Sequence, residues 1–206
     1  MPKLKKDTVY KDIPSPENGK IVALDVSLEH TGVSIIDINL KPNLSTDKHV
    51  NNLVIEINKG KKTLERITGP ARLSAIKKQL SNLINTEDLV IIEGYAFGAR
   101  GSSGISLGEL GGVIRTWLYE SGVRYIEIPP TQIKKFITGS GNAPKETMLK
   151  EVYKRYNFDT NDNNLADAYC IGEVGLALVG KNEQCLTVGQ RVVIQTILKS
   201  YWEKEV

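Results

Sequence analysis

Short apolar runs separated by polar turns predict five strands. IVALDVS at 21–27 and TGVSIIDI at 31–38 flank a short polar turn and indicate a hairpin. NLVIEIN at 52–58 predicts a third strand, and VRYIEI at 123–128, which stops at Pro129 and Pro130, predicts the last. LVIIE at 89–93 is apolar without alternation, which is typical of a strand buried on both faces.

Between and after these strands, apolar positions recur at helical spacing. Thr63 is placed to cap a helix that runs to about Leu83, with an interruption at Gly69 and Pro70. Further helices are predicted at 105–120, 131–137, 145–156, 164–179 and 187–204. This order of elements predicts an α/β fold, with a mixed five-stranded sheet flanked by helices.

The length of 206 residues suits one domain with its own core. We expect residues 1–19 to form a flexible N-terminal arm, residues 20–180 the main domain, and residues 181–206 a helical extension packed on that domain. The sequence shows neither a membrane span nor a secretory signal, and its two cysteines form no disulfide framework or zinc motif. We therefore expect a cytoplasmic protein without a membrane partner.

Three carboxylates stand where apolar segments meet a break or a small residue. Asp25 lies in the first strand, Glu93 ends the strand 89–93, and Asp167 lies in the helix 164–179. Each alone has an ordinary explanation as a turn, a strand end or an ion pair. Together they favour a site for hard divalent cations, because an acid attached to a buried strand is costly unless a cation compensates it.

Four segments, in order, resemble the RuvC family of Holliday junction resolvases, in the ribonuclease H-like fold, and especially its phage branch. The segments are LDVSLEHTG, IIEGYAFG, LGELGGVIRTWL followed by IPPTQIKKFITGSGNAPKETM, and LADAYCIGEVGLAL. The resemblance runs from about Ile21 to Leu178. It implies a homodimeric, RuvC-like nuclease domain at 20–180 that binds branched DNA, especially four-way junctions, and makes paired nicks using Mg²⁺ or Mn²⁺, with two ions expected.

The resemblance also assigns metal ligands. Asp25, Glu93 and Asp167 match the first-strand, second-strand and helix ligands of the family. The family's fourth ligand, an Asp or a His, falls on Asn164, which brings no charge. Asp162 is the alternative, slightly favoured, although either residue also suits the cap of the helix.

The remaining candidates bind DNA or assist the reaction. Lys145 matches a basic residue near the cleaved phosphate and is a catalytic candidate, and Lys134, with Lys135 beside it, matches another cation. Phe97, or alternatively Tyr95, matches an aromatic residue that stacks at the junction centre. The remaining DNA-binding candidate is Arg100, in the same glycine- and serine-rich loop.

Three other functions remain open. A general branched-DNA nuclease would share every motif. A catalytically impaired junction-binding protein is suggested by Asn164. An actin-like ATPase would also pair Asp25 with the glycine-containing turn at Thr31 and Gly32, but it needs a second domain for which this chain is short.

Overall fold

The computed structural model describes residues 9–39, 50–57, 59, 66–95 and 102–203. The strands are β1 (Ile21–Asp25), β2 (His30–Ile36), β3 (Val50–Glu56), β4 (Leu89–Glu93) and β5 (Arg124–Ile128). The helices are α1 (Gly69–Ser81), α2 (Ser102–Glu120), α3 (Pro130–Thr138), α4 (Lys145–Tyr156), α5 (Asn163–Leu178), the short 3₁₀ turn η2 (Glu183–Cys185) and α6 (Val188–Trp202).

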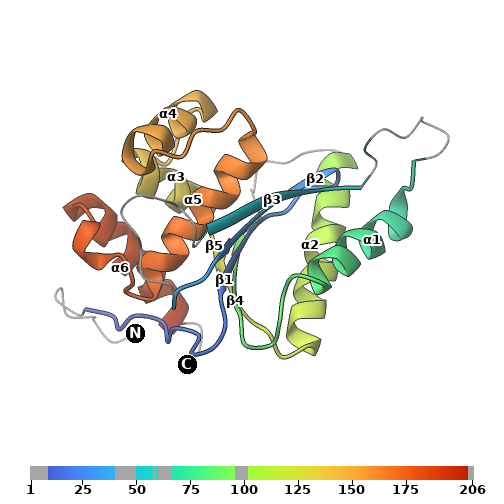
Figure 1. Ribbon diagram of the computed structural model, residues 1–206, viewed down its shortest axis with the longest axis horizontal. Coiled ribbons are helices and arrows are strands. Elements are labelled where there is room, and N and C mark those ends of the chain that lie inside the picture. The colour runs from blue at the N-terminus through green and yellow to red at the C-terminus, as the bar shows by residue number, and fades with distance from the viewer. Residues whose placement is uncertain (1–8, 40–49, 58, 60–65, 96–101, 204–206) are drawn as a thin grey trace.

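The described strands form one mixed sheet in the order β3-β2-β1-β4-β5. β1 pairs antiparallel with β2 and parallel with β4, and β4 pairs parallel with β5. The predicted α/β fold with a five-stranded mixed sheet is confirmed. Helices α1 and α2 lie on one side of the sheet and α3 to α6 on the other, so two separate cores form (Figure 1).

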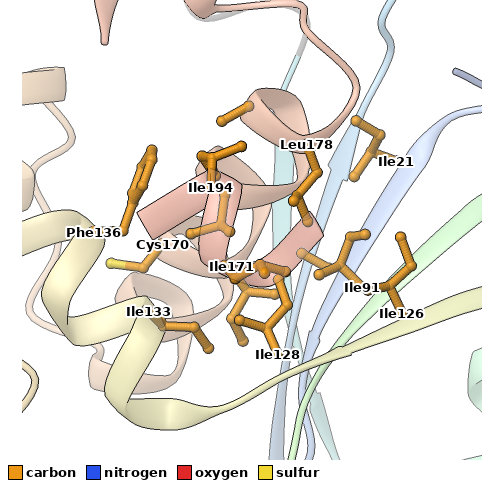
Figure 2. Packing of buried hydrophobic residues seen from close by; sticks show 14 of the residues in the cluster. Ile21, Ile91, Ile126, Ile128, Ile133, Phe136, Cys170, Ile171, Leu178 and Ile194 are labelled. Carbon is orange, nitrogen blue, oxygen red and sulfur yellow. The ribbon is translucent and has the colours of Figure 1, made fainter. Parts of the chain in front are cut away.

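Alternation along the central strands decides which core each side chain joins. Val22 and Leu24 of β1 pack toward α1 and α2, whereas Ile21 and Ala23 pack toward α5. β4 repeats the pattern, and Figure 2 shows its Ile91 beside Ile21 and Leu178 in the core under α5. Because the two strands start in register at Ile21 and Leu89, equivalent positions along them face the same helix.

Helix α5 lies directly on the sheet at its N-terminal end. Gly32 of β2 sits against the backbone carbonyl of Asn164, and a Cβ at Gly32 would collide with that oxygen. Only glycine permits this approach. The start of α5, with its polar residues, is therefore held close to the β1–β2 hairpin.

Two expectations need correction. The helix predicted from Thr63 begins instead at Gly69 with Pro70 in its first turn, where the missing N–H of proline is tolerated, and Thr63 lies outside the described residues. Residues 9–19 are not a flexible arm: Ile13 is buried and donates its N–H to Leu178 O at 2.9 Å. Periodicity of apolar residues does not reveal such a segment, because individual contacts hold it and its apolar residues follow no helix or strand repeat.

Residues 181–203 continue from α5 and return across the same face. The apolar side of α6 packs on α3 and α5 through Val193, Ile194, Ile197 and Leu198. A capping box between Thr187 and Gln190 fixes the start of α6. Within the described part of the chain, no helix combines the length and apolarity that crossing a membrane requires.

Candidate active site

Three carboxylates meet at the carboxyl ends of the two central parallel strands. Asp25 is the last residue of β1 and Glu93 the last residue of β4. By the alternation of each strand, both side chains point to the face that α5 covers. Asp167, in the second turn of α5, faces the same space and interacts electrostatically with both acids.

Burial and mutual repulsion raise the pKa values of these acids. Burial, followed by the charges of Asp167 and Glu93, raises the pKa of Asp25 to about 7. Burial also raises the pKa of Glu93, with Asp167 adding to the effect, and burial raises the pKa of Asp167. Clustered acids with raised pKa values are typical of sites that bind a cation or transfer a proton.

The acids lie within electrostatic range but do not form a preassembled ligand cage. Among the residues that the structure describes, no three His, Cys, Asp or Glu side chains are arranged tightly enough to hold one metal ion. The carboxylates repel one another, and this repulsion adds to the rise in their pKa values. Their oxygen atoms are nevertheless the donors that Mg²⁺ and Mn²⁺ prefer, so the residues present fit hard divalent cations.

Two lysines face the acids from neighbouring helices. Lys145, the first residue of α4, places its Nζ 3.4 Å from Oδ2 of Asp167. Lys134 of α3 opposes the rise in the pKa of Glu93 and of Asp167. Lys135 is exposed and lines a small pocket of about 80 Å³ beside Phe136 and Arg155. The structure therefore brings Lys134 and Lys145 to the acids, and not Lys135.

Similarity to known proteins shows the family of the chain. The family model described as "Crossover junction endodeoxyribonuclease RuvC" matches residues 21–173. The chain belongs to the RuvC family. A RuvC of Prochlorococcus marinus (strain MIT 9312) is 33% identical over 171 residues, which span 80% of this chain and 98% of that protein. A RuvC of Synechococcus sp. (strain CC9311) is 28% identical over 161 residues, with 76% and 97% covered.

Solved RuvC structures share the fold. The Thermus thermophilus RuvC structure matches with a TM-score of 0.57 and 17% identity, covering 79% of this chain and 97% of that one. The T. thermophilus RuvC in complex with Holliday junction substrate matches with a TM-score of 0.57 and 18% identity, covering 80% and 98%. These matches confirm the ribonuclease H-like fold. The relatives named here are bacterial, so the expected phage branch is not confirmed.

Where the sequence analysis expects a fourth metal ligand, at Asp162 or Asn164, the structure shows a helix cap. Asp162 is the N-cap of α5, and its Oδ1 accepts hydrogen bonds from the N–H of Asn164 at 2.8 Å and of Leu165 at 3.3 Å. The side-chain amide of Asn164 donates to the same oxygen at 3.2 Å. Asp162 adds a small rise to the pKa of Asp25, so it lies near the acids while serving as a cap.

Of the predicted DNA-binding residues in the loop after β4, the structure describes only Tyr95. Its ring lies under the guanidinium of Arg115, whose Cζ is 4.2 Å from the ring centroid. Arg115 also donates two hydrogen bonds to Glu127, from Nε at 2.7 Å and from Nη2 at 2.9 Å. Phe97 and Arg100 lie outside the described residues.

Gly111 explains why this arrangement fits. A Cβ at Gly111 would stand 2.6 Å from Nη1 of Arg115 and 2.7 Å from the hydroxyl of Tyr95. The brace formed by Tyr95, Arg115 and Glu127 therefore depends on a bare backbone in α2. Sequence reasoning missed Arg115 and Glu127. The one available signal was the glycine pair in LGELGG, which equally suits a dimer contact.

Proposed function

We propose that this chain is a metal-dependent, structure-selective endodeoxyribonuclease that resolves four-way DNA junctions by paired symmetric nicks. The observation that carries the proposal is the convergence of Asp25, Glu93 and Asp167 at the ends of two central strands and on α5, in a chain of the RuvC family. The names of the relatives, crossover junction endodeoxyribonucleases, support the same substrate class.

Each side chain has a proposed role. Asp25, Glu93 and Asp167 would hold two divalent ions, Mg²⁺ or Mn²⁺, with Asp162 or Asn164 as a fourth ligand. When bound, such ions activate water and neutralise charge on the phosphate. Lys145 adds positive charge beside Asp167, where it would stabilise the phosphate in the transition state. Lys134 would hold the DNA backbone near Glu93, and Lys135, Arg100 and Phe97 would contact DNA farther away.

Cleavage of both strands at one junction calls for two such sites. We therefore propose a homodimer, because a twofold axis would present two identical sites to strands of like polarity. Sedimentation velocity, with and without a four-way junction, tests this assembly. A monomer that still makes paired nicks would contradict it.

The decisive experiment is cleavage of a labelled four-way junction beside a matched duplex and flap. Wild type should nick the junction in pairs with Mg²⁺ or Mn²⁺, and Asp25→Asn should not cut while it binds the junction as tightly or more tightly. Cutting of every branched DNA would instead indicate a general branched-DNA nuclease. Junction binding without cleavage would favour the catalytically impaired protein, for which Asn164 and the capping role of Asp162 are the supporting observations.

A further inference from the structure

A groove of about 1070 Å³ opens at Gly94, the residue that follows Glu93 in the chain. Gly94 and Lys134 line its inner end, next to Glu93. From there it follows β5, because three consecutive strand residues, Tyr125, Ile126 and Glu127, all line it. Neighbouring strand residues point to opposite faces, so a groove that touches all three runs along the edge of the strand. β5 is the last strand in the sheet order, which leaves that edge without a described partner strand.

The lining of the groove suits bases better than phosphates. Tyrosine rings come from three separate parts of the chain: Tyr95, Tyr125 and Tyr201. Neutral hydrogen-bonding side chains stand between them, namely Thr131, Gln132, Asn142, Thr196 and Ser200. Only two lining residues are charged, Lys134 and Glu127, and the carboxylate of Glu127 is bound by Arg115. Aromatic faces with neutral donors and acceptors are typical of surfaces on which unpaired bases stack.

Tyr95 is held as a rigid platform at the inner end. The guanidinium of Arg115 covers one face of its ring, and the hydroxyl donates to Gly108 O at 3.4 Å. The residue is nevertheless 44% exposed. Because these contacts already hold the ring, it loses little entropy when a base stacks on its exposed part.

The far wall of the groove comes from α6, which lies outside the family match at 21–173. Thr196, Ser200 and Tyr201 contribute this wall. It is tied to the N-terminal segment, because the N–H of Tyr10 donates to Gln195 at 2.8 Å and Nε1 of Trp202 donates to Lys11 O at 2.8 Å. Two segments outside the matched region thus fix one side of the groove.

We propose that this groove binds an unpaired stretch of DNA strand that leads away from the cleaved phosphate. The proposal rests on the proposed nuclease function, and it adds a subsite for single-stranded nucleotides that α6 completes. The continuity of the groove with the acids through Gly94 and Lys134 selects a DNA strand over a peptide, which would otherwise suit an open strand edge. Its volume of about 1070 Å³ slightly exceeds the roughly 300–1,000 Å³ range of small-molecule sites, so it has room for more than one base.

Binding of a fluorescein-labelled single-stranded pentadeoxynucleotide tests the proposal, using the full chain in EDTA so that cleavage plays no part. Tyr201→Leu and Tyr125→Leu should each weaken binding about tenfold, because each removes one stacking surface. Tyr201→Phe keeps the ring and should bind as wild type does. Tyr119→Leu removes an exposed tyrosine of α2 outside the groove lining and should also bind as wild type does. Thermal unfolding of each variant establishes that it is folded.

Photocrosslinking locates the bound strand without any substitution. A pentanucleotide carrying 5-iododeoxyuridine should crosslink to Tyr201 or Tyr125, and mass spectrometry identifies the tyrosine. Crosslinks only to tyrosines outside the groove would overturn the proposal, as would unchanged affinity in a folded Tyr201→Leu variant. These outcomes are separate from the nuclease assay: junction cleavage with a groove that binds no strand would refute this inference alone, and groove binding without cleavage of any DNA would refute the nuclease function alone.

Discussion

Removing the charge of Asp25 should stabilise the metal-free protein. The pKa of this carboxyl rises from 3.8 to about 7 on folding, so the folded protein keeps a proton that the unfolded chain releases. Because the folded pKa is the higher one, the free energy of unfolding falls as the pH rises from about 4 to about 7. Above that range the whole cost of ionising Asp25 in the folded protein is present. A shift of roughly 3 pH units corresponds to about 4 kcal/mol.

Asp25→Asn reproduces the shape of the neutral carboxyl and cannot ionise. In urea unfolding with EDTA, the free energy of unfolding of Asp25→Asn should exceed that of wild type by up to about 4 kcal/mol at pH 8 and by about 1.5–2 kcal/mol at pH 5. Glu17→Gln, which removes an exposed carboxylate, should stay within about 0.5 kcal/mol of wild type at both values.

Divalent cations should act in the opposite direction. Saturating Mg²⁺ or Mn²⁺ should stabilise wild type, because the ions bind the folded state, and should stabilise Asp25→Asn far less. Equal stability of the two metal-free proteins at pH 8, or a difference that does not shrink toward pH 5, would refute the electrostatic account of Asp25.

Three further predictions concern the surroundings of the acids. Asp162→Ala should lower the free energy of unfolding, measured in urea, by about 1 kcal/mol, whereas Asp162→Ser should keep the cap of α5. An equal loss of stability in the two variants would contradict the capping role. Lys145→Ala should slow single-turnover junction cleavage about 10²-fold, while its junction affinity in EDTA changes far less. Lys150→Ala is the matched control. If Lys145→Ala reduced the cleavage rate and the affinity equally, Lys145 would be a binding residue only. A methyl group at Gly112 meets open space, so Gly112→Ala should stabilise α2 by about 0.5–1 kcal/mol. Gly111→Ala should lose that gain, because its methyl group displaces Tyr95 and Arg115. Identical unfolding curves for the two variants would argue against the brace.

The sequence predicts the sheet well and its periphery less well. The continuously apolar run at 89–93 matches β4 at both ends, because a fully buried strand needs apolar residues on both faces and little else does. The sequence predicts a helix from Thr63 with an interruption at Gly69 and Pro70, and in the structure α1 begins at that interruption. The anchoring of residues 9–19 was missed, because it depends on α5 and α6, which are distant in sequence.

The candidate site also has parts that the sequence predicts and parts that it does not. The acids were predictable because each stands on an element whose apolar pattern is strong, and the ends of β1 and β4 follow from that pattern. Which lysine faces them was not predictable: Lys134 and Lys135 are neighbours, and the orientation of α3 separates them. The brace of Arg115 and Glu127 was also hidden, because it joins α2 to β5 by a contact that leaves no local periodicity.

The order of these parts along the chain implies that cutting and strand binding are separable. All three acids and Lys145 lie within 21–173, the region matched to the RuvC family, and two of the acids end strands whose other residues are buried on both faces. This frame holds like charges near one another despite their repulsion. The outer groove wall instead depends on α6 and on the segment of Tyr10 and Lys11, which lie outside that region. Substitutions in α6 should therefore change which DNA is held while leaving the chemistry at Asp25 intact, whereas substitutions at the strand ends should abolish cleavage on every substrate.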